Sequence, residues 1–303
     1  MDLRPSEEQQ QLRDALRRLF ERRLNDIIDR LPEPPVDDAA RDLADASAVG
    51  LAGLGLPEDV GGAGTFADLV VAHEELGRGL AGPLFTSLGI AGRLLLHAAG
   101  EGRDEVLAAT VDGSRTDVPV VEGESAVVVG DLRLTIDRAG LAAYHAEVAL
   151  LAAARQLGGG RAVIARTIEH VKTREQFDRP IGTFQAVQHQ LADIASELDA
   201  TELTVAQGAW AVDARRPLNE VRRLAAIAAL TATAAFRRAT LVAHQLHGGM
   251  GFVLDSPLHL WSARAVVDPA VPMTRAELLD DLADASGITA DVIVEPLDHR
   301  VSP

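Results

Sequence analysis

The stretch RTIEHVKTREQFDRPIGTFQAVQHQLADI, from Arg166 to Ile194, decides the fold. Its first part places apolar and small side chains at helical spacing, and Pro180 and Gly182 then break that pattern. Thr183 is suited to cap a second helix, because apolar residues at helical spacing resume just after it. The stretch therefore predicts two long helices joined by a tight turn.

The predicted turn carries an unusual density of polar and aromatic side chains: Arg174, Gln176, Phe177, Phe184, Gln185, Gln188 and His189. A salt-bridged helical hairpin would explain only some of them. The full wording, TREQFDRPIGTFQAVQHQLAD, resembles the flavin-binding signature of acyl-CoA dehydrogenases, approximately R-x-x-F-G-x-P-I-x-x-F-Q-x-x-Q-H-x-L-A-D. The chain is thereby identified as a member of that flavoprotein family, subject to the rest of its sequence.

Composition limits the function classes that the chain can belong to. Its 303 residues suffice to bury a proper core, and the low aromatic content with plentiful Ala, Leu and Arg favours helices. A formal charge of −16 argues against nucleic acid as a partner. The absence of cysteine excludes disulfides, thiolate metal sites and cysteine nucleophiles, and we predict no metal site.

Neither a signal sequence nor a membrane span is evident. The N-terminal residues MDLRPSEEQQQLRDALRRLF are charged throughout, unlike the apolar core of a secretory signal. No charge-free apolar run reaches the roughly 20 residues that a membrane span needs. We therefore expect a soluble, cytoplasmic protein without a membrane partner.

The N-terminal part is predicted to be helical. Ser6–Leu24 is amphipathic and begins with a Ser6/Gln9 capping pattern, and further helices are expected over Asp38–Val49 and Leu84–Ala99. The glycine-rich segment between them has no phosphate-loop motif. It resembles instead the N-terminal domain of acyl-CoA dehydrogenases, through the motif at 54–64 and the EELGR motif at 74–78.

The middle of the chain is predicted to hold only a few short strands. Val118–Val121, Ala126–Val129 and Leu132–Ile136 have strand-like composition and are separated by Glu-Gly-Glu and Gly-Asp turns. In acyl-CoA dehydrogenases a full β-domain at this place covers the flavin ring and carries a T-E-P-x-A-G-S-D-like segment. That segment is missing here, and this is the largest departure from the family.

The C-terminal part is predicted to be a bundle of three long antiparallel helices, over Ala142–Val171, Phe184–Ala214 and Leu218–His247. The glycines at Gly158–Gly160 are expected to permit close helix packing. The third helix runs into QLHGGMGFVLDSPLHLWSARA, which resembles the second flavin-binding signature of the family.

These observations predict a mainly α protein with an acyl-CoA dehydrogenase-like fold. We expect an N-terminal helical domain (1–100), a much reduced β segment (101–140), a bundle domain similar to a four-helix bundle (141–268) and a tail of unknown role (269–303). Within the tail, TRAELLDDLADAS reads as a short acidic helix, followed by a β-like run. For the tail, interface packing and disorder are both open.

The resemblance implies a set of FAD contacts that reach across a subunit interface to a flavin held by a neighbouring subunit. The arginine can grip the diphosphate with a fork of donors, and the glycines allow close backbone approach. Asp178 replaces the usual glycine of the signature and tolerates a left-handed turn, but its carboxylate is unfavourable near a diphosphate. The implied contacts are Arg174, Gln176, Phe177, Phe184, Gln185, Gln245, Gly248 and Gly249.

The catalytic base of the family has no secure counterpart in this chain, so the catalytic residues stay unknown. The downstream family position falls on Pro272, and the position on the long helix falls on Val148, beside Glu147. Glu147 is a candidate base, but we favour an exposed helix carboxylate as its interpretation. Asp268 and Glu277 are further candidates.

Without a ring-covering domain or a secure base, the resemblance implies a subunit of a two-subunit enzyme. Some bacterial acyl-CoA dehydrogenases, notably those acting on steroid side-chain CoA thioesters, divide the flavin site between two kinds of subunit. We expect a hetero-oligomer, taken as a heterotetramer, that binds FAD, dehydrogenates an acyl-CoA in lipid or steroid catabolism and can pass electrons to an electron-transfer flavoprotein. The alternatives are a homomeric dehydrogenase with a displaced base and a flavin-free structural or acyl-binding relative.

Overall fold

The protein is described by a computed structural model that covers residues 3–33, 39–115, 117–266 and 273–288. Helices dominate, as predicted. The α-helices are α1 Glu7–Ile28, α2 Ala39–Ala48, α3 Phe66–Arg78, α4 Pro83–His97, α5 Arg103–Val111, α6 Arg138–Thr173, α7 Gln185–Asp213, α8 Leu218–His247, α9 Leu258–Val266 and α10 Arg275–Ala285. The strands are β1 Ala98–Ala99, β2 Val120–Glu122, β3 Ala126–Val129, β4 Leu132–Ile136, β5 Glu175–Gln176 and β6 Arg179–Pro180. Short 3-10 turns are η1 Leu51–Gly53, η2 Glu58–Val60, η3 Ile181–Thr183 and η4 Gly248–Phe252.

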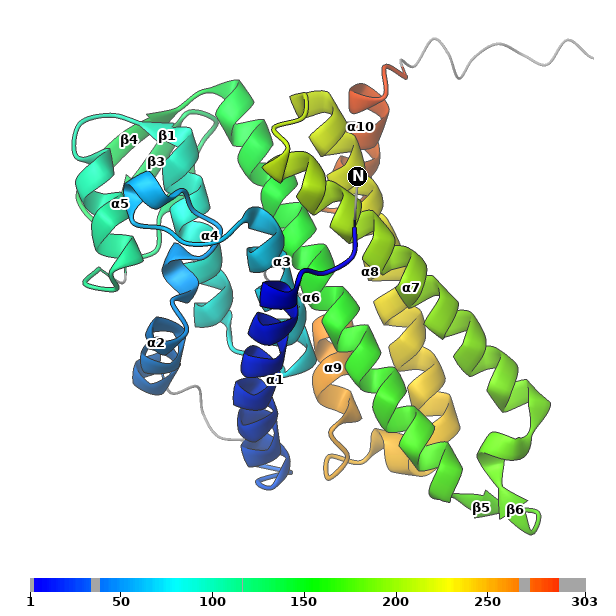
Figure 1. Ribbon diagram of the computed structural model, residues 1–303. Helices are drawn as coiled ribbons and strands as arrows, with labels where there is room; N and C mark the ends of the chain where they lie inside the picture. Colours follow the sequence, from blue (N-terminus) through cyan, green and yellow to red (C-terminus); the bar gives the residue numbers. More distant parts are fainter. Residues whose placement is uncertain (1–2, 34–38, 116, 267–272, 289–303) are drawn as a thin grey trace, which may run out of the picture.

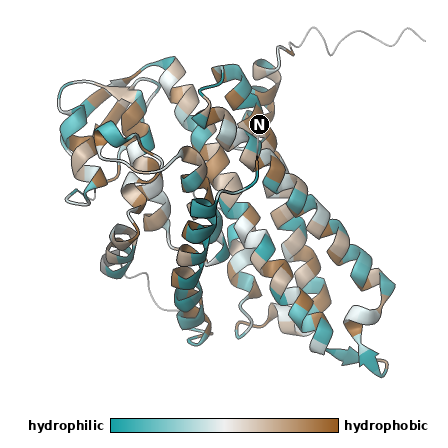
Figure 2. Cartoon of the chain, in the orientation of Figure 1, coloured by the Kyte–Doolittle hydropathy of each residue, from teal (hydrophilic) through white to brown (hydrophobic). Residues whose placement is uncertain are grey.

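The first helix, α1, begins as predicted. The Ser6 hydroxyl accepts a hydrogen bond from the Gln9 N–H at 3.1 Å, and the Gln9 side chain accepts one from the Ser6 N–H at 3.0 Å. Leu16, Phe20 and Leu24 recur every four residues and are buried, whereas the outer face of α1 is hydrophilic (Figure 2). The helix continues to Ile28, one turn beyond the predicted end.

Two acidic residues of the EELGR motif (74–78) connect α3 to α1 through ion pairs. Arg13 donates to buried Glu74 at 3.0 Å, and Arg17 makes two hydrogen bonds to fully buried Glu75, at 2.7 and 3.1 Å. Burial raises the pKa of Glu74, and the Arg13 charge opposes that rise. Arg13 and Arg17 are four residues apart, so one face of α1 reaches both carboxylates.

The reduced β segment is a four-stranded antiparallel sheet in the order β1-β4-β3-β2 (Figure 1). The prediction of a few short strands is confirmed, with β2 two residues later at its start than expected. β1 replaces the predicted end of a helix: Ala98 pairs with Ile136 and Ala99 with Thr135. This pairing joins segments far apart in the sequence, which a local pattern cannot reveal. The sheet and the β5–β6 hairpin lie at opposite ends of the molecule (Figure 1).

The three long helices α6, α7 and α8 form the predicted bundle (Figure 1), and glycines allow α3 to cross α6 closely. A Cβ on Gly158 would lie 1.8 Å from the Glu74 carbonyl oxygen, and a Cβ on Gly77 would lie 1.9 Å from that of Arg155. Both distances are far below van der Waals contact. The expectation that Gly158–Gly160 serve close helix packing is therefore confirmed.

One hydrophobic cluster unites the N-terminal helices with the bundle. It contains Phe20 of α1, Leu69 of α3 and Phe85 of α4 together with Leu150 of α6 and Ala229 of α8. The predicted domain boundaries at 100 and 141 stay a prediction. Within the described residues, side chains from before residue 100 and from after residue 141 pack in this one cluster. The sheet has a smaller core of its own with α4 and α5.

The acidic helix predicted in the tail is α10, which packs on α8. Thr274 caps its first turn, Leu278 is buried, and Arg222 of α8 donates to Asp281 and, at 2.8 Å, to Asp284. The described part of the tail therefore belongs to the packed body of the protein. The predicted β-like run lies almost wholly outside the described residues.

One segment within the described residues, Leu218–Phe252, is long and apolar enough to cross a membrane by length and composition. Half of its most apolar window is buried inside the protein, where α8 packs against α6, α7 and α10. The core helix of a bundle satisfies the same criterion, because it is apolar for the sake of packing.

Candidate functional site

The predicted turn is a β-hairpin with a two-residue loop at the end of α6. Arg174 ends α6, with its N–H bonded to the His170 carbonyl at 2.8 Å, and β5 then pairs with β6. Phe177 and Asp178 occupy the hairpin loop with φ values of 56° and 62°. Two successive positive φ angles define a type I′ turn. The left-handed conformation expected at Asp178 is confirmed.

The predicted cap of α7 is wrong. Phe184, rather than Thr183, precedes the first helical residue Gln185, and its side chain makes no capping hydrogen bond. Thr183 lies in the 3-10 turn η3, where its hydroxyl donates to the Pro180 carbonyl at 2.7 Å. The tight connection between hairpin and helix thus directs the hydroxyl back into the turn, which residue spacing alone does not show.

The second flavin signature lies at the same end of the bundle. Gly248 terminates α8 with φ 60° and ψ −138°, a conformation that glycine alone adopts readily. The His170 and His247 rings stack at a centroid distance of 4.0 Å and an interplanar angle of 19°, joining the ends of α6 and α8. Two signatures with 51 residues between them in the sequence (194–244) are therefore brought together.

The predicted flavin contacts form an outward-facing surface. Phe177 is 86% exposed and makes an edge-to-face contact with Phe184 at 6.1 Å, and the Arg179 guanidinium lies 4.1 Å from the Phe184 ring centre. The Arg174 side chain makes no ion pair or hydrogen bond with the other described residues. Phe184 is half-buried, and the exposed members are Arg174, Gln176, Phe177, Gln185, Gln245, Gly248 and Gly249.

This surface fits one end of FAD. Arg174 offers an uncommitted guanidinium to a diphosphate, and a Cβ on Gly248 or Gly249 would meet nothing within 4 Å, so their backbone is open to a ligand. A flavin ring finds no comparable shelter here, because the four-stranded sheet lies at the opposite end of the molecule (Figure 1). The residues present fit the diphosphate and adenosine end of the cofactor.

Glu147, the candidate base, is 4% exposed, so the interpretation as a solvent-exposed carboxylate is wrong. Arg93 donates to it from Nε at 2.9 Å and from Nη2 at 2.5 Å, and His97 Nε2 lies 3.1 Å from its Oε1. Burial alone would raise the pKa of Glu147, but the His97 hydrogen bond and the Arg93 charge outweigh burial and lower it. Both oxygens are thus engaged in a structural ion pair.

The other candidate bases do not replace it. Asp268 and Pro272 lie outside the described residues. Glu277 is exposed and accepts the Thr274 N–H at 2.6 Å, as part of the cap of α10. Across the described part of the chain, no group of three or more His, Cys, Asp or Glu side chains could hold a metal ion.

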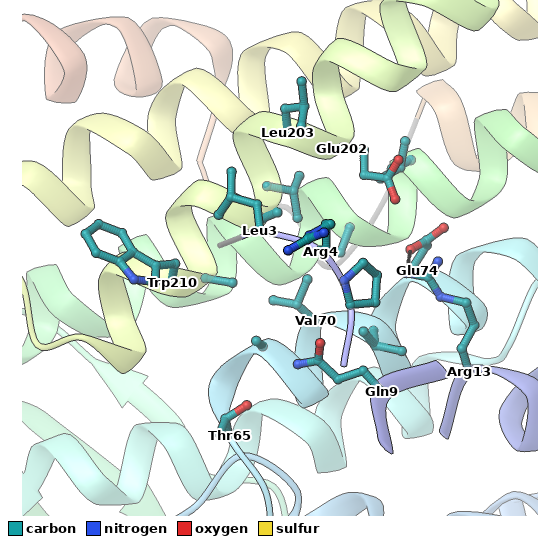
Figure 3. Close-up of a pocket in the computed structure, with 18 of the residues that line it drawn as sticks. Leu3, Arg4, Gln9, Arg13, Thr65, Val70, Glu74, Glu202, Leu203 and Trp210 are labelled. Carbon is teal, nitrogen blue, oxygen red and sulfur yellow. Dashed lines mark hydrogen bonds and ion pairs between the residues drawn. The ribbon is translucent and has the colours of Figure 1, made fainter. Parts of the chain in front are cut away.

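A cavity of about 450 Å³ lies apart from the flavin signatures, where α1, α3, α6 and α7 meet. Figure 3 shows Leu3 and Arg4 across its mouth, between Trp210 of α7 and Arg13 of α1. Its walls are mostly small and apolar. None of the eight predicted flavin contacts lines it, and sequence reasoning missed it because four separate segments create it.

Comparison with known proteins identifies the family. Residues 6–114 match the description "Acyl-CoA dehydrogenase, N-terminal domain", and residues 146–270 match "Acyl-CoA dehydrogenase, C-terminal domain". Acyl-CoA dehydrogenase IpdE2 of Mycobacterium tuberculosis is 31% identical over 255 residues, which cover 72% of this chain and 77% of that protein. The chain belongs to the acyl-CoA dehydrogenase family, as its sequence predicted.

A shorter match and two solved structures agree. Acyl-CoA dehydrogenase FadE27 of Mycobacterium tuberculosis is 40% identical over 110 residues, which cover 34% of this chain and 29% of that protein. A chain of the Mycobacterium tuberculosis ChsE4-ChsE5 complex superposes with a TM-score of 0.76 at 21% identity, covering 98% of this chain and 100% of that one. Butyryl-CoA dehydrogenase of Megasphaera elsdenii superposes with a TM-score of 0.80 at 16% identity, with coverages of 94% and 100%. The predicted fold is confirmed.

Proposed function

We propose that this chain is the flavin-completing subunit of an FAD-dependent acyl-CoA dehydrogenase. The observation that carries the proposal is the outward-facing surface at the end of the bundle, where Arg174 is uncommitted and the Gly248–Gly249 backbone is open. A cofactor enclosed within one chain would draw such groups inward. Here they face outward, where a second chain can reach them.

Six of the eight residues of this surface have a proposed role toward the cofactor. Arg174 would hold the diphosphate with its fork of donors, and the backbone at Gly248 and Gly249 would approach the same group. Gln185 and Gln245 would offer amide groups to the adenosine end, beside the apolar ring of Phe177. FAD, when bound, supplies the acceptor for the hydride that leaves the β-carbon of the acyl-CoA.

The base that removes the α-proton is assigned to the partner subunit. A general base must reach its proton with a carboxylate that is not already committed. Glu147 is buried and held by Arg93 and His97, so it is a positioning residue of the fold in this proposal. A homomeric dehydrogenase with a displaced base is disfavoured for the same reason.

The partner proposed is a second acyl-CoA dehydrogenase subunit of a different kind. Two solved structures of the same fold support this choice, since each is named for a pair of chains, the ChsE4-ChsE5 complex and the steroid ACAD Tcur3481-Tcur3483. The match to the latter has a TM-score of 0.75 at 24% identity. An acyl-CoA thioester as substrate, transfer of electrons to an electron-transfer flavoprotein and a cytoplasmic location belong to the same proposal.

The test is co-expression and co-purification with a full-length acyl-CoA dehydrogenase subunit from the same genome. We expect the chain alone to be colourless and inactive, and the complex to carry FAD and oxidise an acyl-CoA. In the complex, Arg174→Gln should weaken FAD binding roughly 10- to 100-fold, the usual consequence of losing one charge-assisted contact. Lys172→Gln is the matched control, because Lys172 is a nearby cation that pairs with Glu169 at 2.8 Å.

The outcomes separate the proposal from its alternatives. Stoichiometric flavin and activity in the chain alone would establish a homomeric dehydrogenase. A complex without flavin would establish a structural or acyl-binding relative. Flavin binding that is equal in Arg174→Gln and Lys172→Gln would remove Arg174 from the site.

A further inference from the structure

A second concave site lies at the flavin end of the bundle, but none of the eight predicted flavin contacts lines it. The groove has a volume of about 620 Å³, within the usual range for small-molecule sites. It lies between α1, α3, α6 and the segment from the end of α8 to the start of α9. Its charged or titratable lining residues are Glu21, Arg78, Arg166, Glu169, His170 and His247.

Arg166 is a half-buried cation in this groove without an anionic partner among the described residues. Its guanidinium lies 5.1 Å from the ring centre of Trp261, which is fully buried. Burial lowers the pKa of Arg166, which shows that the charge loses hydration without gaining a carboxylate. This cation–π contact holds the guanidinium at the indole and leaves its N–H groups to bind another molecule.

Arg78, the last residue of the EELGR motif, is the second cation that lines the groove. Its Nε is buried and makes no hydrogen bond within the described residues, and the Glu75 carboxylate oxygen lies 3.5 Å away. That carboxylate already accepts two hydrogen bonds from Arg17. The two glutamates of this motif therefore bind α1, and its arginine, held beside Glu75, lines the groove.

The charge and polarity of the remaining lining residues indicate which other groups a ligand of this groove would carry. Glu169 is exposed and neutralised by Lys172 at 2.8 Å, and Glu21 is exposed on α1. The stacked imidazoles of His170 and His247 add further nitrogen atoms. The walls between these polar groups are apolar, formed by Leu24, Ala162, Ala165, Met250, Pro257 and Leu258.

We infer that this groove binds a small organic phosphate, with Arg78 and Arg166 on the phosphate and the apolar walls around the organic part. Two guanidinium groups suit a phosphate, whose oxygens can accept from both forks at once. A chain with a net charge of −16 gains no general attraction for anions, so such binding depends on these local cations.

The probe for this site is phenyl phosphate, which joins a phosphate to an apolar ring. Calorimetric titration of the full chain should give saturable binding, weaker binding of inorganic phosphate and none of phenol. In a Trp210→Phe protein, phenyl phosphate should also change the fluorescence of Trp261, the remaining indole, which lies under Arg166. Equal binding of phenol would overturn the inference, since the cations would then have no role.

Substitutions locate the binding at the two arginines. Arg166→Gln and Arg78→Gln should each weaken phenyl phosphate roughly 10-fold or more, as expected when a charge-assisted hydrogen bond is lost. Arg166→Lys keeps the charge without the fork and should lie between. Arg18→Gln is the control, because Arg18 is an exposed arginine of α1 that does not line the groove.

Circular dichroism confirms that each variant is folded before titration. If Arg166→Gln is unfolded, the Arg78→Gln and Arg166→Lys proteins carry the test. Unchanged affinity in the folded arginine variants overturns the inference. The assay contains no flavin and no partner subunit, so it does not depend on the flavin contacts proposed for Arg174.

Discussion

Two arginines, Arg93 and Arg174, show how the same side chain serves opposite purposes in this protein. Arg93 is buried between α4 and α6, where Glu147 accepts two of its hydrogen bonds and the Gly55 carbonyl accepts a third at 2.8 Å. Arg174 is exposed at the end of α6 and has no side-chain partner among the described residues. The first is neutralised within the chain, and the second is presented outward.

The difference gives a physical criterion for locating function in this family member. A buried charge must be paired, because an unpaired one would cost several kcal/mol of stability. An exposed charge costs almost nothing to leave unpaired, so it can be held ready for a ligand or another subunit. By this criterion the α4–α6 region is structural, and the end of the bundle is the region that we propose for the cofactor.

The largest expected effect on stability is at Glu147. Glu147→Gln leaves the buried Arg93 without a counter-charge, and we expect the free energy of unfolding to fall by about 3–5 kcal/mol. Denaturant titration measures this loss. The double variant Arg93→Met/Glu147→Leu should recover most of it, because no buried charge is left unpaired.

The control for Glu147 is Glu169→Gln on the same helix. Glu169 is exposed and pairs with Lys172, so its substitution should change the unfolding free energy by less than about 0.5 kcal/mol. Equal losses for the two glutamates would contradict the comparison, since burial would then make no difference.

Glycines give the next largest contrast. Gly158→Ala places a methyl group 1.8 Å from the Glu74 carbonyl oxygen, which forces α3 and α6 apart and should cost about 1–3 kcal/mol. Gly249→Ala meets nothing within 4 Å and should be stable to within about 0.5 kcal/mol. Thermal and denaturant unfolding of the pair decide the point. A destabilised Gly249→Ala protein would show that the Gly248–Gly249 motif is required for folding.

Acid sensitivity is expected from a buried histidine. Burial and the nearby Arg155 charge lower the pKa of His73 to about 3. Between its ordinary pKa of about 6.5 and 3, the unfolded chain binds a proton that the folded chain excludes, so stability is lost as pH falls through this window. The contribution is at most about 1.4 kcal/mol per pH unit.

His73→Leu isolates this contribution. Denaturant titrations between about pH 7 and about pH 5 should show a shallower loss of stability in the variant than in the parent, whatever their stabilities at neutral pH. Parallel curves would mean that His73 does not titrate as its burial predicts.

The smallest expected effect on stability is at Arg174. Arg174→Gln removes an exposed side chain without a partner and should change the unfolding free energy by less than about 0.5 kcal/mol. The same variant is expected to weaken FAD binding in the complex roughly 10- to 100-fold. Loss of both stability and flavin would show that Arg174 supports the fold, and that the contrast with Arg93 is not one of purpose.

Much of the fold could be predicted because its helices are long and their apolar spacing is regular. The capping pattern at Ser6 and the three bundle helices follow from local sequence. β1 and the cap of α7 could not be predicted, since strand pairing of Ala98 with Ile136 and the turn geometry at Thr183 depend on distant or irregular backbone. Among candidate site residues, Glu147 was misjudged because its partner Arg93 lies 54 residues earlier.

By itself, the sequence determined the family, the helical architecture, the reduced β segment and the motifs that resemble the family's flavin-binding signatures, because these depend on residue types at fixed local spacing. Only the tertiary structure decided which charged side chains form ion pairs within the chain and which face outward without a partner among the described residues. It buried Glu147 against Arg93, gathered the Arg174 hairpin and the Gly248 turn at one end, and placed Arg166 in a groove without an anionic partner among the described residues. The physical reason is that burial and pairing are properties of neighbours in space, which spacing along the chain does not specify.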